Sequence, residues 1–564
     1  MISNVRLLFL EFKVVAVVLF FAALAVFTRA NIIFNGLKSC ERWLRRLARR
    51  KTLSVLLIGL LVLATRAALI AILGIPQPSI HDEFSYLLAA DTFAHGRLTN
   101  PSPPMWIHFE SFHIILQPTY MSMYPPAQGM FLAFGEILGH PWIGVLFSTA
   151  LMCAALCWMF QGWLPPDWAL LGGILVVLRI GILSYWMNSY WGGSVPALGG
   201  ALVLGALPRL QRKPSTTVAC LMAIGLIILA NSRPYEGLAL SLPVAVILLM
   251  WMMGKHRPPL KLSLRNVVFP MAAILAVGAF AGGYYNHRVT GSAFKMPYQV
   301  NQATYGQAPL FLWQKPRPQP AYHHPLMREF YTQYLKSYQN ERTPRGLWTR
   351  MMGIILLCWL SFIGPALSIP LVAFPYARRD RRVQPALWIL GIFMLAILCE
   401  TWIQCHYFAP AMGLFFLIVL QCMRHLAKWH WRQFMVGSAL VRAVPLICVF
   451  MVVMRLSLIP SRAPGAPLGP QDHLTRSAIL QKLDSLPGKQ LVIVHYDANH
   501  YAGDEWVYNS ADIDHSKVLW ARDMGTADNQ ELLRYFSARK SWMLQADQTP
   551  PRLDPLSPPA STLP

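Results

Sequence analysis

The stretch Ile80-His81-Asp82-Glu83-Phe84-Ser85-Tyr86 follows directly after an apolar span at about 53–75 and opens the longer segment 76–129. Two adjacent carboxylates, Asp82 and Glu83, are therefore expected where a membrane helix meets water. Ionisable side chains at this depth are costly, which makes them candidates for a functional site. Acidic residues also occur in solvated loops just outside a bilayer, so position alone leaves that alternative open.

The composition around this stretch is that of a membrane protein. Of the 564 residues, 55% are hydrophobic and only 13% are charged, whereas a soluble protein carries about a quarter charged residues. Many apolar runs approach twenty residues, the length that crosses a bilayer as a helix. The sequence predicts an all-α polytopic membrane protein with about 11–13 transmembrane helices.

A first span covers 14–34, and the second is the one that precedes Asp82. The remaining spans are expected at about 141–160, 168–187, 192–208, 216–231, 238–254, 267–285, 347–374, 385–402, 411–423 and 433–459. If the chain crosses the membrane at each span, every short basic block falls on the same side. These blocks lie at 209–213, 255–265, 378–382 and 424–432.

Basic loops are typical of the cytoplasmic side of a membrane. We therefore attribute much of the net charge of +24 to orientation in an anionic bilayer, and we expect no nucleic-acid partner. The protein is predicted to be a multi-pass protein of the plasma (inner) membrane. Asp82, the outer loops 76–126 and 286–346, and the chain after about 460 are predicted to be extracytoplasmic.

Three parts follow from this topology. They are an N-terminal transmembrane anchor with a basic cytoplasmic linker (1–52), a transmembrane catalytic domain (53–459) and a small C-terminal extracytoplasmic α/β domain (460–564). In the last part we expect a strand at 491–495, a helix at 528–539, a strand at 541–544 and a disordered tail after Thr549. The nine cysteines lie in or beside apolar spans, so no disulfide framework is expected.

Several polar and aromatic residues fall on the same predicted side as Asp82. They are Tyr124, Trp191, Arg233, Glu236, His406 and Tyr407. A carboxylate there would act as a general base, and Arg with His would hold a phosphate group. Each residue also has a structural alternative. Arg233 and Glu236 are spaced to form a local ion pair, and Trp191 and Tyr407 would suit the interfacial aromatic belt. The pair His323-His324 is expected to be a surface feature.

The arrangement of these motifs resembles a known family. A membrane helix, the outer Asp82-Glu83 pair, an amphipathic segment from Tyr86 to Leu98 and then Tyr124-Pro125-Pro126 look like the GT-C superfamily. The resemblance is to the protein O-mannosyltransferase and aminoarabinose lipid A transferase group. The late stretch His406-Tyr407-Phe408-Ala409-Pro410 is similar to the Arg/His-Tyr-x-x-Pro element of that family, which more often has Arg first.

The resemblance implies an integral-membrane glycosyltransferase. Such an enzyme takes a sugar from a polyprenyl-phosphate donor and transfers it, with inversion, to a lipid, glycan or protein acceptor on the extracytoplasmic face. Asp82 would be the catalytic base with Glu83 as its partner. The donor phosphate and substrates would be bound by Tyr124, Trp191, Arg233, Glu236, His406 and Tyr407. No cofactor is expected, and a divalent cation is not favoured because no third oxygen ligand could be placed.

Two other classes remain open from the residues alone. A transporter or flippase of lipid-linked or polar solutes would place ionisable sites near the bilayer midplane and often shows internal repeats. No repeat is seen, and the charged candidates gather at one interface, with Arg179 and Glu136 as exceptions. The third class is a non-catalytic scaffold whose outer domain binds a partner.

Overall fold

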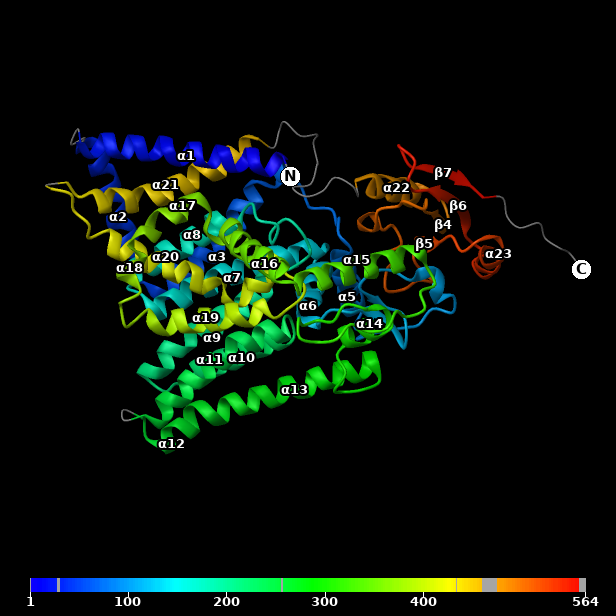
Figure 1. Ribbon diagram of the computed structural model, residues 1–564, viewed down its shortest axis with the longest axis horizontal. Coiled ribbons are helices and arrows are strands. Elements are labelled where there is room, and N and C mark those ends of the chain that lie inside the picture. Colours follow the sequence, from blue (N-terminus) through cyan, green and yellow to red (C-terminus); the bar gives the residue numbers. More distant parts are fainter. Residues whose placement is uncertain (1, 28–30, 255–256, 433, 459–473, 557–564) are drawn as a thin grey trace, which may run out of the picture.

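The computed structural model describes residues 2–27, 31–254, 257–432, 434–458 and 474–556. Most of the chain is a bundle of roughly aligned helices, and a small mixed sheet lies at one end (Figure 1). Eight helical segments in the described residues are long and apolar enough to cross a membrane. These are Arg6–Leu24, Lys51–Ala68, Pro141–Trp163, Pro234–Met253, Leu260–Thr290, Pro344–Ala377, Cys405–Leu426 and Val436–Ser457.

Two shorter apolar helices, Thr216–Ala230 and Gln384–Leu398, accompany these eight. The other expected spans, 168–187 and 192–208, correspond to α8 (Pro166–Val176), which a π turn extends to Gly181, and to α9 (Ser194–Arg212). The predicted fold class, a polytopic helical membrane protein with a small C-terminal α/β domain, is confirmed. By length and composition, eight helices in the described residues could cross a membrane, which is fewer than the 11–13 expected.

The helices of the bundle follow one another closely. In chain order they are α1 (Ile2–Phe27), α2 (Asn31–Arg49), α3 (Lys51–Ala68), α4 (Ile70–Leu73), α7 (Pro141–Trp163), α8, α9, α10 (Thr216–Ala230), α11 (Pro234–Met253), α12 (Leu260–Ser263), α13 (Phe269–Thr290), α16 (Pro344–Cys358), α17 (Gly364–Ser368), α18 (Phe374–Ala377), α19 (Gln384–Leu398), α20 (Met412–Leu426) and α21 (Val436–Ser457). Several begin with proline, whose missing N–H is not needed in the first turn of a helix. At the centre, α7 packs against α3, α8 and α9.

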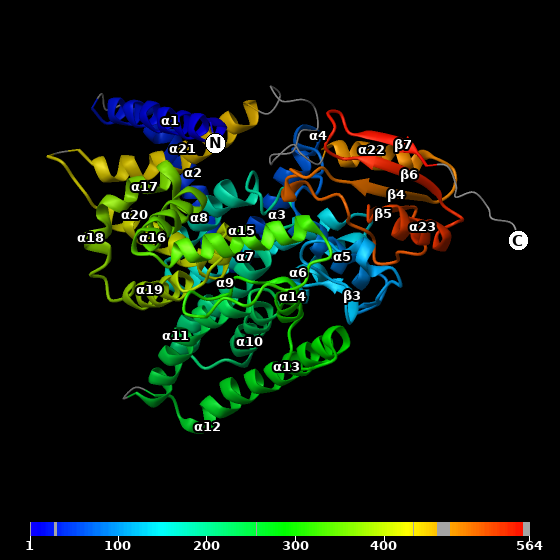
Figure 2. The ribbon, with the colours of Figure 1, turned by 45° about the vertical axis from the view of Figure 1, so that its right-hand side comes forward.

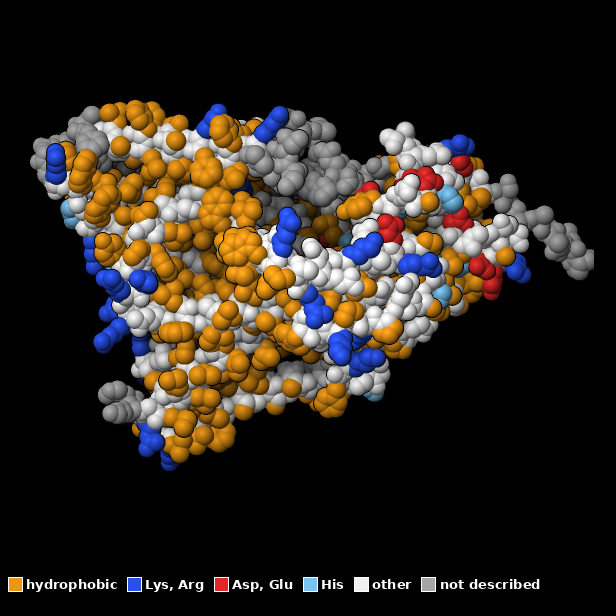
Figure 3. All heavy atoms as spheres, in the orientation of Figure 1, with side chains coloured by type: hydrophobic (Ala, Val, Ile, Leu, Met, Phe, Trp, Pro, Cys, Tyr) orange, Lys and Arg blue, Asp and Glu red, His pale blue; other side chains and the backbone are white. Residues whose placement is uncertain are grey.

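Acidic side chains gather at the sheet end of the molecule. Figure 3 shows hydrophobic side chains over the helical part, Asp and Glu on the sheet end, and Lys and Arg both at the end of the bundle away from the sheet and among the acidic side chains. Asp82 is in the first turn of the helix His81–Ala94, which Figure 1 places between the bundle and the sheet.

The segments between the bundle and the C-terminal domain form a second layer. They comprise α5 (His81–Ala94), strands β1 (Asn100–Pro101), β2 (Ile114–Ile115) and β3 (Thr119–Ser122), α6 (Pro126–Ile137), α14 (Pro297–Tyr305) and α15 (Pro325–Glu341). The three strands make a small antiparallel sheet in the order β1-β3-β2. The long loop 286–346 is therefore largely helical, and α15 crosses in front of α5 in Figure 2.

The C-terminal domain has a four-stranded sheet in the order β5-β4-β6-β7. Its elements are α22 (Leu474–Ser485), β4 (Gln490–His495), β5 (Val518–Arg522), α23 (Thr526–Tyr535), β6 (Lys540–Gln545) and β7 (Arg552–Pro555). Strands β5 and β6 flank β4 in parallel, and β7 is antiparallel to β6. The two predicted strands and the predicted helix correspond to β4, β6 and α23. The tail prediction was wrong where β7 forms, because backbone pairing to β6 orders it; residues 557–564 and the linker 460–467 lie outside the described residues.

This domain packs directly on the outer layer (Figure 2). The rings of Phe84 in α5 and Tyr508 stack at 4.3 Å between centroids. Arg522 Nε donates a hydrogen bond to the Glu110 carbonyl at 2.6 Å, and the Ala511 N–H donates to Asp91 Oδ2 at 2.6 Å. The C-terminal domain therefore packs against α5, the helix that begins at His81.

Candidate active site

A cavity of about 450 Å³ lies between the outer layer and the bundle, and Asp82 is part of its wall. This volume is within the usual range of small-molecule sites, about 300–1,000 Å³. The start of α5 contributes Ile80, His81 and Asp82. His113 comes directly before β2, and Met123 and Tyr124 lie between β3 and α6. The stretch that marked the site in the sequence therefore forms one side of the cavity.

Glu83 determines how α5 begins, and it does not line the cavity. Its Oε2 accepts the backbone N–H groups of Ser79 at 2.8 Å and Ile80 at 3.1 Å, and its Oε1 accepts the N–H of Tyr190 at 2.8 Å. The side chain is buried. Both carboxylate oxygens are used to satisfy N–H groups that have no helical partner. The predicted catalytic residue Glu83 thus holds the helix start against the loop that carries Trp191.

Asp82 faces the opposite way and has polar neighbours on several sides. Tyr124 donates a short hydrogen bond to Asp82 Oδ1. Burial by itself would raise the pKa of Asp82. The positive charge available on His113 and His81, the Tyr124 hydrogen bond and the charge of Arg233 outweigh burial and hold this pKa below its usual range. The carboxylate is therefore the stable form near neutral pH, as a general base requires.

His113 lies beside Asp82, and its backbone carbonyl accepts a hydrogen bond from the Ser85 hydroxyl at 2.6 Å. Its Nδ1 is 3.1 Å from the Tyr124 hydroxyl and 3.6 Å from Asp82 Oδ1. Burial lowers the pKa of His113 to about 3, although Asp82 acts in the opposite direction. At pH 7 this imidazole is neutral, so the charge on Asp82 is supported there mainly by Tyr124 and Arg233.

The opposite wall of the cavity contains several of the residues expected to bind substrate. Trp191, His406 and Tyr407 all line the cavity, whereas Tyr124 lies beside Asp82. His406 is buried, and its Nδ1 lies 3.1 Å from the Tyr185 hydroxyl. These aromatic side chains are parts of the cavity wall, which argues against placing Trp191 and Tyr407 in a lipid-facing belt.

Close backbone packing positions the segment that carries His406. A Cβ on Gly200 of α9 would lie 1.9 Å from the carbonyl oxygen of Pro410. Only glycine allows this approach, and the 3-10 turn Cys405–Ala411 therefore lies directly on α9. The loop before α9 also carries Trp191. The positions of Trp191 and of the His406 segment therefore both depend on α9.

Arg233 and Glu236 lie behind the cavity wall and are not part of its lining. The Arg233 guanidinium is 4.3 Å from the centre of the Tyr407 ring, and its Nη1 is 3.6 Å from Glu236 Oε1. The ion pair expected as the structural alternative is thus present. Arg233 nevertheless contributes positive charge to the cavity, because it acts on Asp82 through a poorly solvated region.

The long loop closes the cavity from outside, mainly through α14 and α15. The aromatic residues that it supplies to the lining are Tyr298, Tyr331, Tyr334 and Tyr338. Aromatic faces of this kind suit the apolar faces of sugar rings. The Tyr334 ring lies 3.6 Å from the ring of Trp402, which joins this wall to the residues before His406.

The prediction that His323 and His324 form a surface feature was wrong for His324. His324 is buried, and its Nε2 lies 3.3 Å from Glu110 Oε2, while His323 Nδ1 lies 2.9 Å from the same oxygen. The Tyr305 hydroxyl donates to Glu110 Oε1 at 2.7 Å. This cluster fastens the long loop to the first outer loop, a contact between residues far apart in the chain.

Some cavity residues were not identified from the sequence. His113 stands alone between Phe112 and Ile114, and no motif marks it. His81 could have been noticed, because it directly precedes Asp82 at the start of a helix. Among the described residues, His81, Asp82 and His113 form one of two groups whose side chains are close enough to share a metal ion; the other is Asp91, His95 and Glu136.

Comparisons with known proteins gave similarities in structure only. No family model and no curated protein matches the chain. ArnT from Cupriavidus metallidurans, solved bound to undecaprenyl phosphate, is 13% identical, with 87% of this chain and 93% of ArnT covered and a TM-score of 0.47. The apo form of ArnT is 12% identical, with 87% and 92% covered and a TM-score of 0.48.

An oligosaccharyltransferase from Archaeoglobus fulgidus, solved tethered to an acceptor peptide, is 13% identical over 88% of this chain and 69% of its own, with a TM-score of 0.42. ArnT and this oligosaccharyltransferase are both GT-C membrane glycosyltransferases. They belong to the superfamily that the sequence motifs resemble. At these identities and scores, the likeness says nothing about substrate or mechanism.

Proposed function

We propose that this protein is an integral-membrane glycosyltransferase that moves a sugar from a polyprenyl-phosphate donor to an extracytoplasmic acceptor, with Asp82 as the general base. The observation that carries this proposal is the position of Asp82. It lies in the wall of an aromatic cavity, it is hydrogen-bonded by Tyr124, and positive charge lies close by.

The arrangement provides for each part of an inverting transfer. Asp82 would take the proton of an acceptor hydroxyl as its oxygen bonds to the anomeric carbon. The bond from that carbon to the phosphate oxygen breaks, and polyprenyl phosphate leaves with the bonding electrons. From behind the cavity wall, the charge of Arg233 would stabilise the negative charge on the leaving phosphate, and an N–H of neutral His406 would donate a hydrogen bond to it. The acceptor class, whether lipid, glycan or protein, is not specified by this chemistry.

The cavity lining also supports a carbohydrate substrate. Tyr298, Tyr334 and Trp402 present rings to the same space as Asp82. Glu400 lines it as well, and its Oε2 is buried without a hydrogen-bond partner in the described structure. An unpaired buried acceptor is costly, so a hydroxyl-bearing ligand would compensate for it.

The test is release of polyprenyl phosphate from a panel of polyprenyl-phosphate sugars by the full-length protein in proteoliposomes with envelope acceptors. Asp82→Asn should abolish release while the protein stays folded and keeps its melting temperature. Unchanged release in that variant would remove the proposed base. Movement of a solute across sealed vesicles without consumption of the donor would instead favour a transporter.

A further inference from the structure

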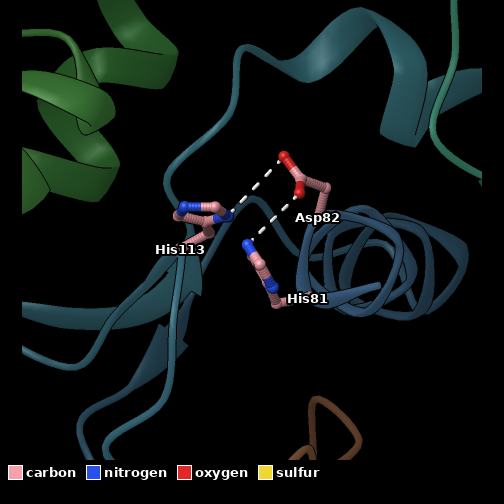
Figure 4. Close-up of side chains that lie close together, drawn as sticks. All are labelled: His81, Asp82 and His113. Carbon is pink, nitrogen blue, oxygen red and sulfur yellow. Dashed lines mark ion pairs between the residues drawn. The ribbon is translucent and has the colours of Figure 1, made fainter. Parts of the chain in front are cut away.

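The cavity wall contains a second carboxylate, which comes from a distant part of the chain. Figure 4 shows Asp82 with the rings of His81 and His113 directed toward it, so the polar neighbours of Asp82 are supplied by the protein. Glu400 also lines the cavity. Its Oε2 is buried and has no hydrogen-bond partner among the described residues. A buried acceptor without a partner is costly, and the protein supplies none for Glu400.

The backbone on both sides of Glu400 is fixed by the long loop. The Leu312 N–H donates a hydrogen bond to the Cys399 carbonyl at 2.9 Å. The Thr401 N–H donates to the Leu310 carbonyl at 2.9 Å. Because the residues before and after Glu400 are both held in this way, its side chain stays at the cavity wall.

The cations near Glu400 are already paired with other carboxylates. Arg350 binds the Glu341 carboxylate, and Arg233 Nη1 lies 3.6 Å from Glu236 Oε1. Both guanidinium groups act electrostatically on Glu400, and so does the like charge of Glu236. Of these three carboxylates, Glu400 is the one that forms no ion pair with the described residues. It is therefore the carboxylate available to a ligand.

Two indole N–H groups in the cavity lining also lack partners. Trp191 Nε1 and Trp402 Nε1 are buried without an acceptor among the described residues, and both tryptophans line the cavity. A hydroxyl group both donates and accepts hydrogen bonds, so a carboxylate acceptor together with indole donors complements a molecule with several hydroxyl groups. The Tyr334 ring, 3.6 Å from that of Trp402, adds an aromatic face of the kind that suits a sugar ring.

From this arrangement we propose that Glu400 determines which sugar the enzyme transfers. Its carboxylate accepts hydrogen bonds from hydroxyl groups of a neutral sugar, and its charge excludes a sugar that carries a carboxylate of its own. The inference rests on the proposed function, since it assigns a task to a second residue of the same cavity. Asp82 acts on the acceptor, whereas Glu400 acts on the sugar.

Two physical effects produce this selection. A site that forms a hydrogen bond to a substrate hydroxyl rejects the analogue without that hydroxyl, because a buried polar group is then left unpaired. Like charges repel strongly in a poorly solvated cavity, so a second carboxylate on the sugar would be rejected by Glu400. The first effect selects against deoxy sugars and the second against uronic acids.

The test compares sugar donors in the release assay with the full-length protein in proteoliposomes. The neutral donors are undecaprenyl-phosphate glucose, mannose, galactose and arabinose, and the acidic donors carry glucuronic or galacturonic acid. The deoxy analogues of the best neutral donor complete the set. In the parent protein we expect kcat/KM to be lower by at least about 100-fold for the acidic donors. One deoxy analogue should lose about 10- to 100-fold.

Glu400→Gln is the diagnostic variant, because the amide has nearly the shape of the carboxylate and no charge. It should lower kcat/KM for the best neutral donor by about 10- to 100-fold. Release from the acidic donors relative to the neutral one should rise by at least about tenfold. The effect of removing the critical hydroxyl should be much smaller than in the parent, since both changes remove the same interaction.

Two further variants separate charge from a general disturbance. Glu400→Asp retains the charge and should still reject the acidic donors. Glu329→Gln is the matched control, because Glu329 is exposed on α15 outside the cavity lining, and it should keep the preference of the parent.

The outcomes distinguish this proposal from the proposed function. A preference for acidic donors in the parent, or a Glu400→Gln variant with the parent's preference, would overturn the task of Glu400 and leave the transferase standing. Release from no donor would overturn both. The acidic and deoxy donors test the parent protein itself, so the proposal can fail even if Glu400→Gln does not fold.

Discussion

At the scale of single residues, the two neighbouring carboxylates at the start of α5 have different tasks. Asp82 lies in the cavity wall and is contacted by Tyr124 and His113. Glu83 is directed into the protein, where backbone N–H groups use both of its oxygens. Successive residues on a helix point in different directions, so adjacency in sequence did not bring both side chains to the same site.

Removing the Tyr124 hydroxyl should weaken catalysis with little effect on folding. Tyr124→Phe retains the ring stacked on Tyr86 and deletes the hydrogen bond to Asp82. A hydrogen bond to a charged group contributes about 1.5–3 kcal/mol, so we expect kcat/KM to fall by about 10- to 100-fold. Tyr285→Phe is the control, because the Tyr285 hydroxyl lies outside the cavity and is buried without a hydrogen-bond partner among the described residues. Equal activity in both variants would show that Tyr124 does not support the base.

Replacing Glu83 should mainly affect stability. Glu83→Ala leaves three N–H groups without their acceptor, which we expect to cost about 2–4 kcal/mol. Thermal unfolding in detergent measures this loss as a lower melting temperature. Glu83→Gln keeps one carbonyl acceptor and should lose less. A variant Glu83→Ala that unfolds like the parent but cannot transfer sugar would instead assign Glu83 a direct catalytic task.

At the scale of elements, the site is assembled from segments that the chain keeps far apart. Helix α5 supplies Asp82, the loop after β3 supplies Tyr124, and the 3-10 turn before α20 supplies His406. Helices α14 and α15 close the cavity and are fastened by Glu110. Loss of the Glu110 contacts should open the cavity without disturbing the bundle.

Acid should loosen the long loop before it unfolds the protein. Burial would raise the pKa of Glu110, but hydrogen bonds from His324 and Tyr305 and the charge on both histidines hold it below its usual value. A depressed pKa contributes stability that is present above the unfolded pKa near 4.3 and is lost as pH falls through the lower folded pKa. Hydrogen exchange of α14 and α15 should therefore accelerate below about pH 4.

The control for this pH dependence is Glu110→Gln, which cannot ionise. Its hydrogen exchange in α14 and α15 should be faster than that of the parent at pH 7 and should change little with acid. Exchange that accelerates equally in both proteins below pH 4 would show that another group controls the loop. The amides of α7, at the centre of the bundle, provide the internal reference.

At the scale of the whole molecule, ion pairs fasten the N-terminal helices to α21, and a hydrogen bond fastens the C-terminal domain to the outer layer. Arg455 of α21 pairs with Glu11 of α1, and Arg442 pairs with Glu41 of α2. In the C-terminal domain, Arg522 pairs with buried Glu505 and reaches the Glu110 carbonyl. The last contact links the domain to the loop that carries His113.

Breaking the buried pair in the C-terminal domain should loosen the domain and reduce transfer. Arg522→Met leaves the buried Glu505 carboxylate without its partner, which typically costs about 3–5 kcal/mol. Limited proteolysis should then cut the chain after residue 474 more rapidly than in the parent. The double variant Arg522→Met, Glu505→Gln removes the unpaired charge and should recover much of the resistance. Failure of the second change to restore resistance would argue against the charge as the cause.

Much of the architecture could be predicted from local patterns. Apolar runs located the helices that are long and apolar enough to cross a membrane. Alternating and continuous apolar stretches identified β4 and β6. Strand β7 was not predicted, because it is short and polar and is ordered by pairing with β6. Strand β5 was not predicted either, although Val518-Leu519-Trp520-Ala521 is an apolar run.

The sequence by itself determined the membrane-spanning class, the grouping of polar candidates at one end of the helices, and Asp82 as the leading candidate base. Each of these depends on residues close together in the chain. Only the tertiary structure decided that Glu83 turns away, that His113 joins Asp82, and that His324 is buried against Glu110. The Tyr190–Glu83 and His323–Glu110 contacts span 107 and 213 residues. Contacts at such separations depend on how the helices pack, and no local pattern of apolar and charged residues encodes them.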